Sequence, residues 1–287
     1  MSQPQPTSPL SLTLHCHQPV GNFPEVFQQI TDESYRPFLE RFHKYPEAGS
    51  IGLHVSGILL EWWSKHAPDL IDLIGDEVEQ NRIEMICAGY YEPILGLIPH
   101  EDRRGQIEKH MDFIETLFEV RPRGMWLTER IWQPELPEDV APVGVKYTFV
   151  DDFHFRCAGW NFDSLGGYYT TEFNGHTLGI FSINQELRYR IPFHDVDRIR
   201  EYLSQGESIS LTIADDGEKF GSWPDTYEWV YEDGWIDRFF EACSKNEIKL
   251  THPGAIFDEE SSRGLCYLPT ASYQEMLEWS LPADAQG

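Results

Sequence analysis

The chain has 287 residues, of which 40% are hydrophobic and 14% aromatic, and this suits a single α/β barrel better than a small module. Its 48 acidic residues outnumber its 22 basic residues and give a net charge of −26, so its surface would repel the phosphates of nucleic acid. We therefore expect no nucleic-acid partner.

The first ten residues are polar and rich in proline. We expect a disordered tail over residues 1–10, followed by one barrel domain over residues 11–287. The tail lacks the charged start and apolar centre of a signal peptide. The chain also has no run of about eighteen apolar residues, as a membrane span requires. The sequence therefore predicts a cytoplasmic protein that does not contact a membrane.

Short apolar runs of strand length alternate with amphipathic stretches along the rest of the chain. The predicted strands span residues 11–15, 51–55, 83–88, 124–127, 146–150, 178–183 and 208–213. Apolar residues at helical or near-helical spacing mark the helices between and after them. Three such groups are Tyr35, Phe38, Leu39 and Phe42; Ile107, Met111, Ile114 and Leu117; and Trp235, Phe239 and Cys243.

Strands that alternate with helices form parallel βαβ units with right-handed crossovers. Seven units fit a closed or nearly closed (β/α)7 barrel, an incomplete TIM-like barrel with its helices outside. A doubly wound sheet is the alternative, because periodicity does not determine closure. Residues 151–177 are rich in Gly, Tyr and Phe without a clear period, and we expect them to form an ordered loop over the barrel mouth.

Polar residues follow nearly every predicted strand. They are His15, His17, His54, Glu92, Glu129, Asp151, Asp152, His154, Asp215, Asp216 and Glu218. The carboxyl ends of barrel strands meet on one rim, where such barrels place their catalytic groups. Glu129 stands between Trp126 and Trp132, and tryptophan rings can serve as flat stacking platforms for sugars. These residues together indicate a site that acts on a sugar.

Cleavage of a glycoside needs one carboxylate and one protonated carboxyl group. A separation of roughly 5–5.5 Å between them retains the configuration at the sugar, and roughly 6.5–9.5 Å inverts it. The doublet Asp215-Asp216 with Glu218 beside it supplies like charges that raise the pKa of a proton donor. Glu129 and one acid of this doublet are therefore the candidate pair.

Metal-assisted hydrolysis, as in deacetylases and amidohydrolases, is the rival chemistry. His15, His17, His154 and an Asp could ligate zinc. However, the chain lacks the His-x-x-x-His and His-Glu-x-x-His patterns, and a metal site leaves Glu129 and its tryptophans unexplained. We therefore favour a site without metal or other cofactor.

Four motifs of the chain resemble, in order, conserved regions of glycoside hydrolase family 57. The motifs are His17-Gln-Pro19, Gly89-Tyr-Tyr-Glu-Pro93, Trp126-Leu-Thr-Glu-Arg130 and Asp215-Asp-Gly-Glu-Lys-Phe-Gly221. The sequences around the last two motifs are similar to those of the branch of 4-α-glucanotransferases and α-amylases. The resemblance covers nearly the whole chain, from about residue 12 to residue 282.

This resemblance implies a (β/α)7 barrel and a retaining double displacement on α-1,4-glucans such as maltooligosaccharides, starch or glycogen, without a metal. Glu129 would be the nucleophile and Asp216 the acid/base, with Asp215 as the alternative. Further residues would contact or surround the sugar. His17, Glu92, Trp126 and Trp223 would line donor subsites, and His15, His54, His154, Asp215 and Glu218 would lie close by.

Members of this family continue into a helical domain and often a β-rich domain, and the chain as given contains neither. We therefore expect either a homo-oligomer or a barrel completed by a missing C-terminal domain. A partial barrel that binds glucan without turnover is the alternative to an active enzyme.

Overall fold

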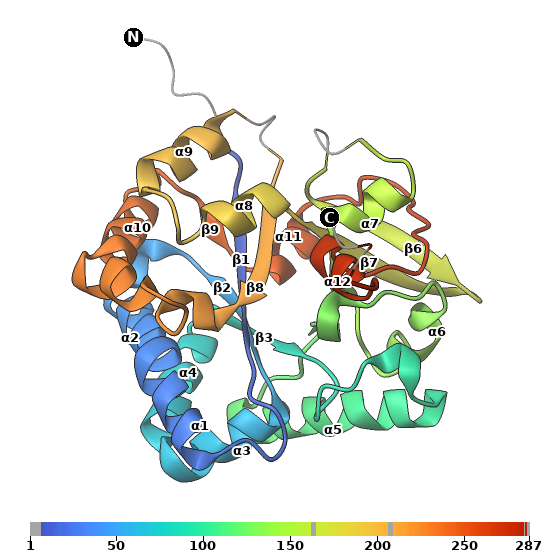
Figure 1. Ribbon diagram of the computed structural model, residues 1–287, viewed down its shortest axis with the longest axis horizontal. Helices are drawn as coiled ribbons and strands as arrows, with labels where there is room; N and C mark the ends of the chain where they lie inside the picture. Colours follow the sequence, from blue (N-terminus) through green and yellow to red (C-terminus); the bar gives the residue numbers. More distant parts are fainter. Residues whose placement is uncertain (1–6, 162–164, 206–208, 284, 286–287) are drawn as a thin grey trace.

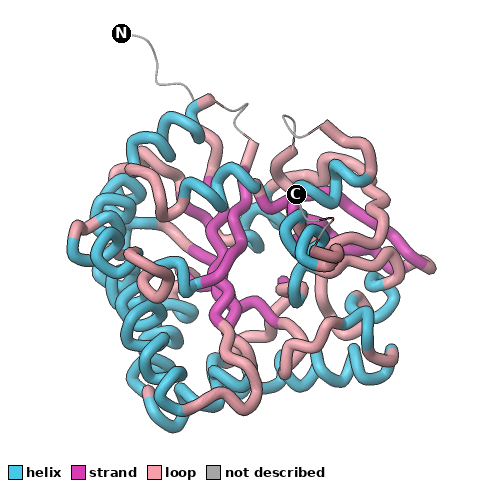
Figure 2. The backbone as a smooth tube through the Cα atoms, viewed as in Figure 1, coloured by secondary structure: helices cyan, strands magenta, loops and turns pink. Residues whose placement is uncertain are grey.

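Seven parallel strands close into a ring in the computed structural model, which describes residues 7–161, 165–205, 209–283 and 285. The ring strands are β1 (Leu10–Cys16), β2 (Ile51–Val55), β3 (Ile83–Cys87), β4 (Gly124–Met125), β5 (Tyr147–Asp151), β7 (His176–Ile183) and β8 (Leu211–Asp216). Each pairs with the next, and β1 pairs with both β2 and β8. The predicted (β/α)7 barrel is therefore confirmed, with its strands inside and helices around them (Figure 2).

The pairing register of β1 places three polar residues at one level of the barrel. His15 lies opposite His54 of β2 on one side and opposite Asp216 of β8 on the other. Paired residues in neighbouring parallel strands direct their side chains to the same face of the sheet. The register therefore brings these three side chains to one end of the ring.

The pairing between β7 and β8, which we call the seam, joins fewer residues than any other pairing of neighbouring ring strands. A single residue pair, Ile183 with Thr212, connects the two strands, and the backbone N–H of Asn184 donates to the carbonyl of Thr212 at 2.8 Å. By contrast, the pairing between β1 and β8 runs from Leu10 to His15. This seam is therefore the weakest part of the ring's hydrogen bonding.

Helices fill the crossovers and lie outside the strands (Figure 1). The three predicted amphipathic stretches fall within or directly before α2, α5 and α10, where their apolar faces pack against the barrel. No helix in the described ranges is long and apolar enough to span a bilayer. The helices are α1 (Pro24–Ile30), α2 (Arg36–Lys44), α3 (Gly57–His66), α4 (Pro68–Glu79), α5 (His100–Phe118), α6 (Leu136–Val140), α7 (Asp152–Cys157), α8 (Gln185–Arg190), α9 (Val196–Ser204), α10 (Trp235–Ser244), α11 (Pro253–Glu259) and α12 (Gln274–Trp279).

The segment 151–177 is not the loop that the sequence predicts. It contains the end of β5, α7 and an additional strand, β6 (Tyr168–Phe173), which pairs antiparallel with β7, while residues 162–164 lie outside the described residues. The residues of β6 alternate between buried and half-buried positions along most of its length. Such an outer strand lacks the continuous apolar run that marked the ring strands.

Some predicted boundaries also differ from the structure. β8 extends to Asp216 rather than to residue 213, and the predicted start at Ser208 lies outside the described residues. β9 (Leu250–Thr251), which pairs with β1, was missed because two residues give no periodic pattern. Residues 1–6 of the predicted tail are outside the described residues, whereas the backbone of residues 8–10 hydrogen-bonds to neighbouring segments.

Gly124 makes room for the packing of the barrel interior at β4. A Cβ atom at this position would lie 2.5 Å from the Tyr147 ring and 2.7 Å from Ile86 Cδ1. Both neighbours are fully buried and cannot move away freely. The strand that leads to Glu129 therefore requires glycine here.

We predict that Gly124→Ala lowers the free energy of unfolding by about 1–3 kcal/mol, because it overpacks a filled interior. Urea unfolding followed by circular dichroism measures this. Gly75→Ala in α4 is the matched control, since its nearest neighbour is 4.0 Å away and alanine favours helix by about 0.5–1 kcal/mol. Equal stabilities of the two variants would contradict the packing role of Gly124.

Candidate active site

The floor of the site is a group of stacked rings at the ends of β1, β2 and β4. The rings of Trp126 and His15 stack with centroids 4.4 Å apart. The Nδ1 atoms of His15 and His54 lie 2.8 Å apart, within hydrogen-bond distance. Burial is the main cause that lowers the pKa of both imidazoles. Two neutral imidazoles can share this hydrogen bond, because one ring donates and the other accepts.

Glu92 connects this floor to His17. Its side chain is only 4% exposed, with Oε2 2.9 Å from His17 Nδ1 and Oε1 3.4 Å from His54 Nε2. Burial by itself lowers the pKa of His17, but the adjacent Glu92 carboxylate outweighs burial and raises it. His17 and Glu92 therefore form a close pair on the floor of the site, in which each residue favours the charged form of the other.

Glu129 lies in the short helical turn η4 (Thr128–Arg130), which follows β4. Glu129 and Arg130 have positive φ angles of 52° and 47°, a conformation that costs non-glycine residues roughly 1–2 kcal/mol each. The Ser272 hydroxyl donates to the Glu129 carbonyl at 2.6 Å, and the Tyr273 hydroxyl donates to Glu129 Oε2 at 2.8 Å. Glu129 itself is exposed, so its carboxylate is accessible to a substrate.

Asp215 is the centre of a buried ion cluster beside the site. Its Oδ2 accepts from Arg188 Nε at 3.0 Å and from the Lys219 ammonium, and Arg130 Nη1 lies 3.8 Å from its Oδ1. Both arginines also contact Asp151 at 2.9 Å. Burial alone raises the pKa of Asp215, but the charges of Lys219, Arg188 and Arg130 outweigh burial and hold the pKa well below its usual range. Asp215 is therefore firmly ionised.

Asp216, the next residue, has the opposite environment. Burial is the main cause that raises its pKa, and the negative charge of Asp215 adds to the rise. Burial also raises the pKa of Glu92 and of Tyr273, and the charges of Asp216 and Glu129 contribute to both shifts. Asp216 and Glu129 therefore both lie close enough to Glu92 and Tyr273 for their charges to act on these two groups.

Glu218 is a further carboxyl group on this rim. Its Oε1 accepts a hydrogen bond from the Tyr35 hydroxyl. Burial, reinforced by the charge of Asp216, raises the pKa of Glu218 to about 7. Glu218 is therefore neutral in mildly acidic solution and takes its charge near neutral pH.

His154 does not join the other predicted site residues. It is fully buried, with Nδ1 3.1 Å from the Asp151 carbonyl and Nε2 2.9 Å from the Arg130 carbonyl. Both ring nitrogens therefore face backbone behind the Glu129 turn. We withdraw the prediction that His154 contacts sugar or ligates a metal, because neither nitrogen is directed to the site.

Trp223 lies outside the ion cluster as a partly exposed ring. Its side chain is 38% exposed and stacks on Phe193, with centroids 6.0 Å apart and 25° between the ring planes. The Lys219 ammonium, which contacts Asp215, lies 5.4 Å from the Trp223 ring. Trp223 is therefore available as a stacking surface beside the cluster.

Arg188, Lys219 and Tyr273 are not among the site residues that the sequence predicts. Lys219 could have been found, because it stands in the Asp-Gly-Glu-Lys motif four residues after Asp215. Arg188 comes from α8 and Tyr273 from the segment before α12, and no sequence pattern connects either residue to the strand ends.

A group of two histidines and one glutamate has the spacing of a metal site. The ligand atoms of His15, His54 and Glu92 lie within 4.8 Å of one another. This set differs from the one suggested by the sequence, which included His154. Two of its members already share the His15–His54 hydrogen bond, and the third is paired with His17. A metal ion would therefore have to compete with these contacts.

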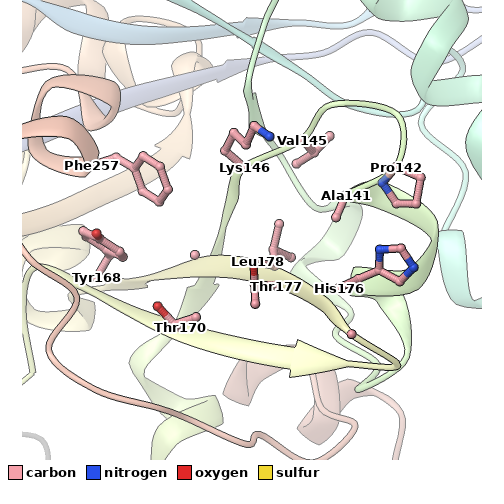
Figure 3. A pocket seen from close by; sticks show the side chains of 12 residues that line it. Ala141, Pro142, Val145, Lys146, Tyr168, Thr170, His176, Thr177, Leu178 and Phe257 are labelled. Carbon is pink, nitrogen blue, oxygen red and sulfur yellow. The ribbon is translucent and has the colours of Figure 1, made fainter.

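A separate pocket of about 340 Å³ lies away from these residues (Figure 3). Tyr168 and Phe257 border one side of it, His176 the other, and Lys146 stands at its edge. Lys146 precedes β5, whereas Asp151 ends that strand next to Arg130. The pocket is thus at the opposite end of β5 from the site, and it contains none of the predicted site residues.

A closed barrel that collects carboxyl groups at the carboxyl ends of its strands holds them where barrel enzymes place their catalytic residues. Residues 11–269 match Glycosyl hydrolase family 57, and the chain belongs to this family. The predicted family resemblance is therefore confirmed.

Relatives with known names are similar over most of this chain. The 4-alpha-glucanotransferase of Thermococcus litoralis is 46% identical over 275 residues, which are 94% of this chain and 41% of that protein. The Alpha-amylase of Pyrococcus furiosus is 45% identical over 276 residues, which are 94% of this chain and 42% of that protein. The crystal structure of the Thermococcus litoralis enzyme has a TM-score of 0.93 at 44% identity, covering 97% of this chain and 44% of that one. The chain therefore spans less than half the length of these relatives.

The Glu218 environment predicts a pH-dependent stability. Between about pH 4.5 and pH 7 the folded state holds a proton on Glu218 that the unfolded state has lost, so stability falls as pH rises through this window. Glu218→Gln removes the titration, and its unfolding free energy should gain about 3 kcal/mol relative to wild type across the window.

Urea unfolding at about pH 4.5, 6 and 8 measures this gain. The control is Glu25→Gln on the exposed side of α1, whose stability should stay parallel to that of wild type. A difference between wild type and Glu218→Gln that is the same at all three pH values would contradict the prediction.

Proposed function

We propose that this chain is the catalytic barrel of a retaining enzyme that acts on α-1,4-linked glucans. The observation that carries the proposal is the contrast between the surroundings of two carboxyl groups that follow barrel strands. Glu129 is an exposed hydrogen-bond acceptor, whereas burial and the neighbouring Asp215 raise the pKa of Asp216. Retaining cleavage needs such a pair, with one ionised nucleophile and one protonated donor.

In the first step, a Glu129 oxygen attacks C1 of the sugar and the bond from C1 to the leaving oxygen breaks. Asp216 gives its proton to that oxygen. In the second step, Asp216 takes a proton from water or a sugar hydroxyl, whose oxygen attacks C1 and releases Glu129 as a carboxylate. The two inversions retain the configuration at C1. Attack by water gives hydrolysis, and attack by a sugar gives transfer.

The surrounding residues suit the recognition of a glucose unit in the donor subsite. The His17–Glu92 pair offers a donor and an acceptor for sugar hydroxyls at the floor, and His15 and His54 lie against Glu92. The exposed ring of Trp223 can stack on the apolar face of a sugar. Trp126 supports the floor through its stack on His15.

Asp215 is unsuited to be the acid/base, which separates the two alternatives left by the sequence. A group whose pKa is held low by Lys219 and Arg188 has no proton to donate at neutral pH. Its negative charge instead raises the pKa of Asp216. We therefore assign proton transfer to Asp216 and the tuning of its pKa to Asp215.

Wild-type protein incubated with maltotriose should produce other chain lengths, and Glu129→Gln should abolish this, because the amide cannot form the glucosyl ester. Chromatography of the products measures both results. Longer oligomers indicate transfer, and shorter products alone indicate hydrolysis. Unchanged maltotriose in the presence of folded wild-type protein would overturn the proposal in favour of a barrel that only binds glucan.

Asp216→Ala should lower turnover by about 10²–10⁴-fold, because it removes the acid/base. Sodium azide should partly restore it and yield the α-glycosyl azide, since azide attacks C1 without needing a base. Product analysis by NMR measures this effect.

Asp215→Asn is the matched comparison. It should lower the unfolding free energy by about 3–5 kcal/mol, because it leaves buried cations uncompensated, and azide should not restore its activity. Rescue of Asp215→Asn rather than Asp216→Ala would reverse the two assignments.

A further inference from the structure

The turn that carries Glu129 is fastened by a distant segment of the chain, residues 268–275, which we call the strap. The strap leads into α12, drawn in red in Figure 1. The backbones of Trp132 and Ala271 exchange hydrogen bonds of 2.9 and 3.3 Å, and Trp132 Nε1 donates to the Leu268 carbonyl at 3.2 Å. The strap is therefore bonded to the chain just after the Glu129 turn.

The strap also contacts Glu129 itself at two points. Ser272 donates to the Glu129 carbonyl, and Tyr273 donates to Glu129 Oε2. One contact fixes the strained backbone, and the other fixes one oxygen of the side chain. The remaining carboxylate oxygen, Oε1, is then the one left to approach a substrate.

The Tyr273 ring is itself held in place. The Arg130 guanidinium lies 4.1 Å from its centroid, and Tyr273 is buried. Arg130 belongs to the same ion cluster as Asp151 and Asp215. Burial, followed by the hydrogen bond to Glu129, raises the pKa of Tyr273, so its hydroxyl keeps the proton that it donates.

We infer that Tyr273 is a positioning residue, whose hydroxyl holds Glu129 so that Oε1 faces C1 of the sugar. This inference rests on the proposed role of Glu129 as nucleophile. The hydroxyl acts through Glu129 and needs no contact with the substrate. Its loss should therefore impair the attack on C1 more than the binding of the glucan.

Tyr273→Phe is the direct test, because it keeps the ring against Arg130 and removes only the hydroxyl. We expect kcat on maltooligosaccharides to fall about 10- to 100-fold, as for a lost hydrogen bond to a charged group, with KM changed less than about threefold.

Tyr267→Phe is the matched control, since this tyrosine precedes the strap and is 63% exposed. It should keep the wild-type kcat and KM. Crystal structures of wild type and Tyr273→Phe add a measurement that needs no turnover. The Glu129 carboxylate should keep its position in the wild type and turn away from it in the variant.

The outcomes separate this inference from the proposed function. If wild type is active and Tyr273→Phe matches Tyr267→Phe in kcat and KM, the positioning role is wrong and the proposed function stands. If wild type leaves maltotriose unchanged, the proposed function fails, and the crystal structures still decide whether Tyr273 fixes Glu129. An unmoved carboxylate in Tyr273→Phe would overturn the inference in either case.

Discussion

The charge of Asp215 inside the barrel wall is the constraint around which the site is arranged. An isolated buried carboxylate is costly, and here Lys219, Arg188 and Arg130 stabilise it. Burial is the main cause that raises the pKa of the neighbouring Asp216, and the fixed negative charge of Asp215 adds to that rise. The pKa values of these two adjacent residues are therefore shifted in opposite directions.

The cluster also links the two sides of the site. Arg130 extends it from Asp215 to the turn of Glu129, where its guanidinium packs on Tyr273. Arg130 itself carries a positive φ angle, so part of the strain of this turn is offset by ion pairs and ring packing. The position of Glu129 and the charge of Asp215 therefore depend on one set of contacts.

Much of the architecture could be predicted from sequence because buried parallel strands have continuous apolar runs and barrel rims collect polar residues. β6 and β9 were missed because a half-buried outer strand and a two-residue strand lack that pattern. His154 was assigned to the site because it follows a strand, yet its ring turns to backbone carbonyls.

The remaining site residues depend on contacts between distant segments. Asp215 and Asp216 are indistinguishable as a doublet in the sequence, and the contacts of Asp215 with Lys219, Arg188 and Arg130 give the two residues different surroundings. Tyr273 reaches Glu129 from the far end of the chain. Side-chain partners separated in this way leave no periodic signal in a single sequence.

The ion cluster also strengthens the narrow seam between β7 and β8. Arg188 stands just beyond β7, and it binds both Asp215 at the end of β8 and Asp151 at the end of β5. The salt bridges therefore connect the end of β7 to β8, where the backbone pairing of these strands is reduced to a single residue pair. A fluctuation that separates β7 from β8 is therefore opposed by these salt bridges as well as by the backbone pairing.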